Sequence, residues 1–216
     1  MDEENINKYS ESSELNKYGA RFKYSKFLKL IDDSNSAITS NITNIIIRRD
    51  LKPSLNQFAD YEICYGNAFH INKMSGYNIK SSGFTVSSVN GTVYLSDTPN
   101  PDGKTGTIFF FTATSSNTPT VVRRNVGRID YERGEITLNP VNITSTLKNV
   151  GGEPIIEISA SPQSNDVIGL QDLYLQLDPS SSVLNMVSDE ISSGSDISGT
   201  SYTVTSSYSN GDLVRK

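Results

Sequence analysis

The chain has 216 residues and a net charge of -5, from 24 acidic residues against 19 lysines and arginines; because a negative chain repels phosphate, this excludes nucleic-acid binding by the chain as a whole. Its single cysteine excludes an intramolecular disulfide. No run reaches the roughly 18 apolar residues of a membrane-spanning helix, and the acidic N-terminus is unlike a signal peptide, so we expect a soluble protein without signal-dependent secretion.

The N-terminal region, residues 1–37, is predicted to hold a polar end and one helix. Residues 1–13 are polar and acidic, and we expect them to be frayed. From Glu14 to Asp33, large apolar side chains recur three to six residues apart, most of them on one helical face, while lysines mark the outer face. The sequence therefore predicts a helix over residues 14–33.

Residues 38–177 are predicted to form a β-rich body, because short runs of β-branched and alternating residues are separated by turn residues. Asn90-Gly91 predicts a two-residue hairpin turn, residues 97–103 a longer hairpin loop, and Gly134 a turn with positive φ. The predicted fold class is mainly β, with antiparallel, sandwich-like sheets. An N-terminal α-helix adds a minor α+β character. The predicted strands are residues 38–49, 61–65, 68–71, 83–88, 92–96, 107–113, 120–125, 127–131, 135–138, 153–159 and 170–177.

Residues 178–216 form a polar C-terminal extension in this scheme. Ser, Gly, Thr and Asp dominate after Asp178-Pro179, and the sparse apolar side chains cannot by themselves offset the entropy lost on ordering. Residues 202–205 alternate like an edge strand that could add to a partner's sheet. We expect the extension to be disordered or to be ordered by a partner.

Two loop motifs resemble ligand sites but fail at required positions. In the 97–103 loop, Pro99 and Pro101 stand where a calcium loop needs ligands. Gly103-Lys104-Thr105 resembles the end of a phosphate-binding loop, but Thr98 occupies the place of its first glycine. Both segments are therefore interpreted as hairpin loop.

The one enzymatic alternative is a nucleophilic pair of Cys64 and His70 across a predicted hairpin. The pair lacks an orienting third group, and a lone cysteine is ordinarily a buried structural residue. His70 is the only histidine, so zinc ligands are also too few. We expect no catalytic residue, no cofactor and no metal site.

Contacts to partner proteins are expected from aromatic and arginine side chains, because these dominate binding energy at interfaces. Each candidate could equally be ordinary core or a solvated strand end, and the paired arginines could form salt bridges to Asp50 or to a partner's carboxylates. The candidate interface residues are Tyr18, Phe22, Arg48, Arg123, Tyr202 and Tyr208.

A resemblance to a known family is carried by several segments in order along the chain. They are Lys17–Phe27, Ile38–Thr43, Ile47–Leu51, Tyr61–His70, Gly127–Tyr131 with the following Gly134-Glu135-Ile136, and Ala160–Val167. Together they resemble the large wedge proteins of T4-like phage baseplates, the products of gene six, which are distantly related to the baseplate J family. The resemblance spans about residues 14–177 and corresponds to the C-terminal part of the longer family protein.

This resemblance implies a mechanical role rather than catalysis. Proteins of the family dimerise, bind other wedge proteins and join neighbouring wedges into a ring around the central hub. It implies a location in the virion tail baseplate, with assembly in the host cytoplasm, and partners that are neither nucleic acid nor membrane. A carbohydrate- or receptor-binding β module of a tail is the alternative, although it would need exposed aromatics along a groove and the chain has no tryptophan. A cysteine hydrolase is the less favoured one.

Overall fold

The computed structural model describes residues 2–71, 77–113, 119–170 and 174–187, together with residues 208–209 and 212–213. The chain forms two compact units, residues 1–177 and 178–216. Antiparallel strands dominate the described residues and helices are few, which confirms the mainly β fold class.

The first unit holds the helices and most strands. They are α1 (Asp2–Ser10), β1 (Arg21–Phe22), α2 (Tyr24–Asp32), β2 (Ile47–Leu51), β3 (Phe58–Cys64), β4 (Lys80–Ser81), β5 (Phe84–Val86), β6 (Val89–Pro99), β7 (Thr105–Ala113), β8 (Pro119–Asp130), β9 (Glu135–Thr146), β10 (Lys148–Val150), β11 (Glu153–Ala160) and β12 (Val167–Ile168). In the second unit, the described residues form the 3-10 turn η1 (Pro179–Ser181) and the paired strands β13 (Tyr208–Ser209) and β14 (Asp212–Leu213).

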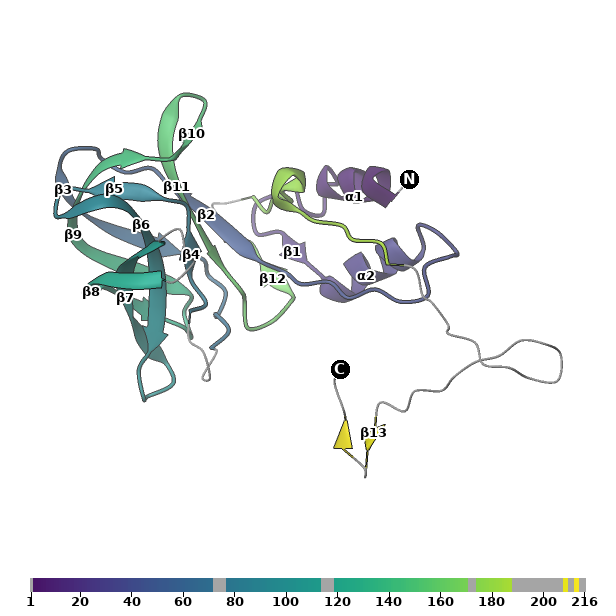
Figure 1. Ribbon diagram of the computed structural model, residues 1–216. Helices are drawn as coiled ribbons and strands as arrows, with labels where there is room; N and C mark the ends of the chain where they lie inside the picture. The colour runs from purple at the N-terminus through teal and green to yellow at the C-terminus, as the bar shows by residue number, and fades with distance from the viewer. Residues whose placement is uncertain are drawn as a thin grey trace. The chain divides into compact units, whose positions relative to one another are not determined.

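The largest described sheet closes into a small barrel. Its strand order is β3-β9-β5-β6-β7-β8, and β8 pairs back onto β9 (Figure 1). The order follows from consecutive antiparallel hairpins, since β5, β6, β7 and β8 each pair with the next strand along the chain. Closure satisfies strand edges that an open sheet would leave unpaired. β3 adds to the outside of this closure by pairing with β9 alone among the described strands.

The main core is made by the inward side chains of the barrel strands and of β11. Phe84 and Phe110 meet edge to face with ring centroids 5.6 Å apart. Burial of each large apolar side chain contributes about 1.5–3 kcal/mol to stability. Side chains at most 2% exposed include Phe84, Val93, Leu95, Ile108, Phe110, Ile129, Ile136, Leu138, Ile143, Ile156 and Ile158.

A second sheet connects the barrel with the N-terminal helices. Its order is β10-β11-β2, and β4 also pairs with β11. β2 and β11 run antiparallel from Ile156↔Leu51 to Ala160↔Ile47. Figure 1 shows β2 and β11 extending from the barrel toward the helices. Ile47 packs against the main core and against the helical cluster, so this strand pair links the two.

The N-terminal helices pack on a smaller apolar cluster of Tyr9, Leu15, Phe22, Phe27 and Val167. The β1–β12 ladder places Phe22 opposite Val167 and so closes the cluster. Lys23, at the N-cap of α2, provides no side-chain cap. The carboxylate of Asp166 instead accepts the backbone N–H of Tyr24 at 2.8 Å, which satisfies a free donor of the first helical turn.

The predicted extent of the N-terminal helix is wrong. Only Tyr24–Asp32 of the predicted 14–33 run is helical, and residues 2–10, expected to be frayed, form α1. Gly19 has a φ of +63°, which ends helical geometry, and Ala20 accepts a 2.7 Å hydrogen bond from the Gly169 N–H. Pairing with a segment far along the chain therefore overrides the helical spacing.

Several predicted strands are also corrected. Residues 38–46 are not strand, because β2 begins at Ile47 where its partner β11 becomes available. Residues 68–71 contain only an isolated bridge from Phe69 to Pro162. In the 170–177 segment the described residues form no strand, only a bridge between Tyr174 and Tyr18; residues 171–173 lie outside the described ranges.

The predicted turns are partly confirmed. The Gly134 turn joins β8 to β9, and a loop joins β6 to β7 over residues 100–104, so only residues 100–103 of the predicted 97–103 loop are loop, whereas residues 97–99 belong to β6. Asn90-Gly91 lies inside β6, and the turn falls at Ser87-Ser88, because β5 pairs with β6 through a register shift. Residues 120–131, predicted as two strands, are joined through Asn125 into the long strand β8, which runs to Asp130.

Candidate interface on the N-terminal helical segment

Tyr18 and Phe22, two predicted interface residues, lie on opposite faces of the same segment. Tyr18 is 60% exposed, and its ring stacks on that of Tyr174 with centroids 4.3 Å apart. Phe22 is 8% exposed and packs between Tyr9 and Phe27, with centroids 6.3 and 5.4 Å away. Tyr18 is therefore available for contact, whereas Phe22 holds the segment in place.

The predicted arginines lie on separate strands. Arg48 on β2 pairs with Asp50 at 3.0 Å, as predicted, and with Glu157 at 3.6 Å. Arg123 is exposed on β8, and its Nη1 donates to the Ser88 hydroxyl at 3.2 Å. Both arginines are thus already engaged within the chain.

The remaining two candidates cannot be placed as side chains. Tyr202 and the predicted 202–205 strand lie outside the described residues. Tyr208 is described through its backbone, which pairs with Leu213 in the β13–β14 hairpin.

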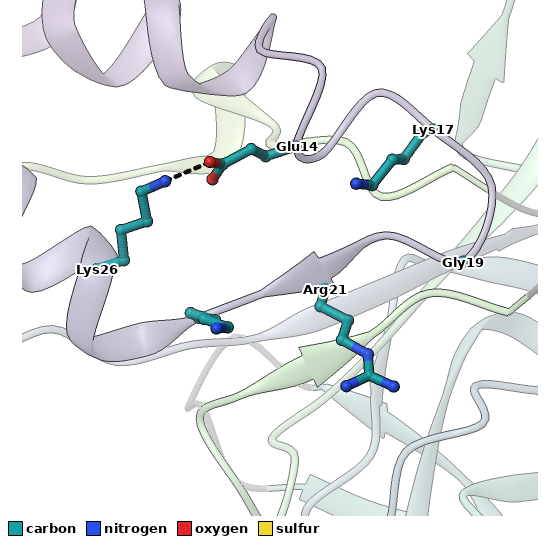
Figure 2. Close-up of a pocket in the computed structure, with 6 residues that line it drawn as sticks. Glu14, Lys17, Gly19, Arg21 and Lys26 are labelled. Atoms are coloured by element: carbon teal, nitrogen blue, oxygen red, sulfur yellow. Dashed lines mark hydrogen bonds and ion pairs between the residues drawn. The ribbon is translucent and has the colours of Figure 1, made fainter.

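A basic pocket lies beside Tyr18 and was not predicted as a site. It has a volume of about 370 Å³ and is lined by Glu14, Lys17, Gly19, Arg21, Lys23 and Lys26. Figure 2 shows Glu14 and Lys17 entering from the loop before β1 and Lys26 from α2, while the Arg21 side chain starts at β1 and turns away from the Glu14–Lys26 pair. We call these six residues the basic pocket.

The local sequence builds this pocket by alternating charge with apolar anchors. Arg21 and Lys23 flank the buried Phe22 on a strand and its continuation, where neighbours point to opposite faces. Lys26 precedes the buried Phe27 on α2, and the buried Leu15 follows Glu14. The anchors enter one apolar cluster, so the charged neighbours are carried to one surface.

Electrostatics in the basic pocket are dominated by lysine and arginine. Lys26 Nζ forms an ion pair and hydrogen bond with Glu14 Oε1, and both side chains are about half exposed. This hydrogen bond lowers the pKa of Glu14 below its ordinary value, and the charges of Lys17 and Lys23 add to the effect. Four cationic side chains against one carboxylate leave the pocket positive.

Sequence reasoning noted the lysines of α2 but missed the pocket as a whole. Its members lie on a loop, a two-residue strand and a helix, which the sequence predicted to be one continuous helix. The one available signal was the adjacency of cations to the aromatic residues Tyr18, Phe22 and Phe27.

The Cys64–His70 alternative finds no support in the geometry. The Cys64 thiol donates to Glu62 Oε1 at 3.7 Å, and the described hydrogen bonds include none between Cys64 and His70. Partial burial, and then the carboxylates of Glu62 and Glu135, raise the pKa of the thiol, whereas a nucleophilic cysteine needs it lowered. His70 is exposed rather than held against the sulfur.

The described part of the chain offers neither a metal cluster nor a membrane-spanning helix. No group of three or more His, Cys, Asp or Glu residues there is arranged to hold a metal ion. None of the described helices is long and apolar enough to cross a membrane.

Fold and geometry together define a β-rich protein whose helical segment presents an exposed aromatic pair beside a cationic pocket. Residues 3–50 match the family model described as baseplate structural protein gp6, C-terminal domain III. The resemblance drawn from the sequence is thereby confirmed over the N-terminal part of its span: residues 3–50 form a gp6-like baseplate segment, which supports a baseplate structural role. The match covers α2, Tyr18 and the whole basic pocket. A search of curated proteins found no match.

Proposed function

We propose that the protein is a wedge connector of a contractile-tailed phage baseplate, which oligomerises and binds neighbouring wedge proteins to form the ring around the hub. The observation that carries the proposal is the gp6 domain III match over residues 3–50. A virion protein of this kind would be assembled in the host cytoplasm and would act mechanically, without chemistry of its own.

The proposed contact surface is the helical segment within that match. Tyr18 and Tyr174 offer a stacked, half-exposed aromatic pair, the kind of side chain that anchors protein interfaces. The adjacent basic pocket supplies charge that can orient a partner. Partners in this proposal are a second copy of the chain and other wedge proteins.

The β body suits a load-bearing part. The barrel closure of β8 on β9 and the β2–β11 link both consist of continuous antiparallel hydrogen bonding. Such a body resists deformation because its core is close-packed. In the proposed connector, interfaces rearrange during contraction while the body stays rigid.

Mass photometry of the purified full chain, alone and with other baseplate components, tests this function. We expect a mass of at least a dimer, or a defined complex with a wedge protein. A strict monomer that binds no baseplate component at physiological salt would contradict the proposal.

A further inference from the structure

The basic pocket has the opposite charge from the chain that carries it. Four cations and one carboxylate line it, whereas the whole chain has a net charge of -5. We propose that this pocket binds carboxylate side chains of an acidic segment on a partner protein. This inference rests on the proposed assembly function and names the chemistry of one partner.

The cations are available because the chain itself does not neutralise most of them. Among the described residues, Lys26 pairs with Glu14, but Lys17, Arg21 and Lys23 form no ion pair. All four cationic residues are exposed. Their mutual repulsion is relieved when a partner supplies negative charge.

Backbone hydrogen bonds fix the strand segment that lines the pocket. The Gly19 N–H donates to Leu170 O at 3.2 Å, and Gly169 donates to Ala20 O at 2.7 Å, which fixes the strand that carries Arg21. The Asp166 carboxylate accepts the backbone N–H of Tyr24, which fixes the backbone next to Lys23 at the start of α2. A preorganised charge cluster loses less side-chain and loop entropy on binding.

Glu14 occupies the position that an incoming carboxylate would take on Lys26. Its side chain is already hydrogen-bonded to Lys26 Nζ at the mouth of the pocket (Figure 2). An acidic partner segment therefore competes with an internal carboxylate and binds more weakly than the cations alone would allow. Removal of the Glu14 charge frees Lys26 and raises the net charge of the pocket.

An acidic protein segment fits better than nucleic acid. Nucleic-acid binding depends on neutralising several successive phosphates, and the net negative surface outside this pocket opposes a long polyanion. Tyr18, the chain neighbour of Lys17, is exposed in its stack with Tyr174 and offers a bound peptide an aromatic contact in the same segment. A short acidic segment satisfies both features at once.

Fluorescence anisotropy of a labelled oligoglutamate peptide with the full chain provides the test. An oligoglutamine peptide and a single-stranded DNA oligonucleotide serve as comparison probes. The variants are the double substitution Lys17→Gln/Lys23→Gln, the single substitution Glu14→Gln, and Lys52→Gln as an exposed lysine outside the pocket. Circular dichroism confirms that each variant is folded.

We expect the full chain to bind oligoglutamate with an affinity that falls as salt rises, and to bind neither the oligoglutamine peptide nor the DNA oligonucleotide. Each exposed cation that contacts a carboxylate contributes up to about five-fold in affinity, so the double variant weakens binding by about two- to twenty-five-fold. Glu14→Gln tightens it by about two- to five-fold, and Lys52→Gln leaves it unchanged.

Equal weakening by Lys52→Gln and by the double variant would overturn the proposal, because binding would then reflect general charge. Unchanged affinity in Glu14→Gln would also overturn it, as would preferential binding of the DNA oligonucleotide. If the chain still assembles with baseplate components in mass photometry, only the pocket inference fails. If assembly is also absent, the proposed function fails with it.

Discussion

The Tyr131 hydroxyl donates a 2.5 Å hydrogen bond to Oδ2 of Asp97, and both side chains are 1% exposed. The other carboxylate oxygen accepts the backbone N–H of Ile79 at 2.6 Å. One buried carboxyl group on β6 therefore joins the β8–β9 turn to the segment before β4. Ser96 reinforces the same junction, since its hydroxyl donates to Ile79 O at 3.1 Å.

Tyr131→Phe is expected to destabilise the protein by about 1–3 kcal/mol, because it leaves Oδ2 of buried Asp97 without its donor. Chemical denaturation followed by circular dichroism measures the change in unfolding free energy. Tyr94→Phe is the matched control, since its hydroxyl makes no hydrogen bond with another described residue. Equal stability of both variants would show that the Asp97 contact contributes nothing.

Asp97 predicts a specific dependence of stability on pH. Burial raises the pKa of its carboxyl above the ordinary value, although the Tyr131 and Ile79 hydrogen bonds oppose the shift. Between the ordinary and raised pKa the folded chain keeps a proton that the unfolded chain has lost, so this contribution to stability falls as pH rises through that window. Asp97→Asn should remove it, which thermal unfolding of both proteins across acidic pH will show.

Asp102 provides a control, because its contribution to stability changes with pH in the opposite direction from that of Asp97. Hydrogen bonds from the Thr105 hydroxyl and from the Lys104 and Thr105 N–H groups lower its pKa to about 2. A lowered pKa gives stability that is present above the ordinary pKa and is lost as pH falls toward about 2. Asp102→Asn should therefore change the pH profile at the acidic end. A profile like that of Asp97→Asn would contradict both assignments.

Gly134→Ala is expected to be much more destabilising than Gly103→Ala. Both glycines have positive φ, +67° and +65°, so both substitutions incur the left-handed backbone cost of about 1–2 kcal/mol. A Cβ at Gly134 would lie 2.0 Å from Asn67 O, whereas one at Gly103 meets nothing within 4 Å. Denaturant unfolding of the two variants measures the difference. Equal losses would mean that the Asn67 loop moves freely.

Tyr18→Ala should impair assembly more than folding. Loss of the Tyr174 stack costs about 0.5–1.5 kcal/mol of stability, but it removes the proposed aromatic anchor. Mass photometry should show loss of the oligomer or complex at concentrations where the unaltered chain forms it. Phe58→Ala, which removes an exposed aromatic on β3 outside the matched segment, is the control. Equal loss of assembly in both variants would show that Tyr18 is not part of the interface.

Features that depend on residues adjacent in the chain could be predicted from the amino-acid sequence. Alternating β-branched runs predicted the mainly β class, because a strand's two faces are set by adjacent residues. The 97–103 loop and the Gly134 turn were predicted because prolines and glycine restrict or permit local dihedrals. A salt bridge of the Arg48-Arg49 pair to Asp50 was one of the predicted options, and the structure forms it from Arg48.

Only the tertiary structure decided the N-terminal segment and its site. Helical spacing continues through Gly19, but hydrogen bonds with residues 169–170 turn residues 21–22 into a strand. The same pairing places Lys17 and Lys26 in the lining of one pocket. It also stacks the ring of Tyr18 on that of Tyr174, a residue far along the chain. No local pattern encodes such contacts, because their free energy comes from burial shared between distant segments. The proposed contact surface therefore forms only when the N-terminal segment meets residues 166–174 at the far end of the β body.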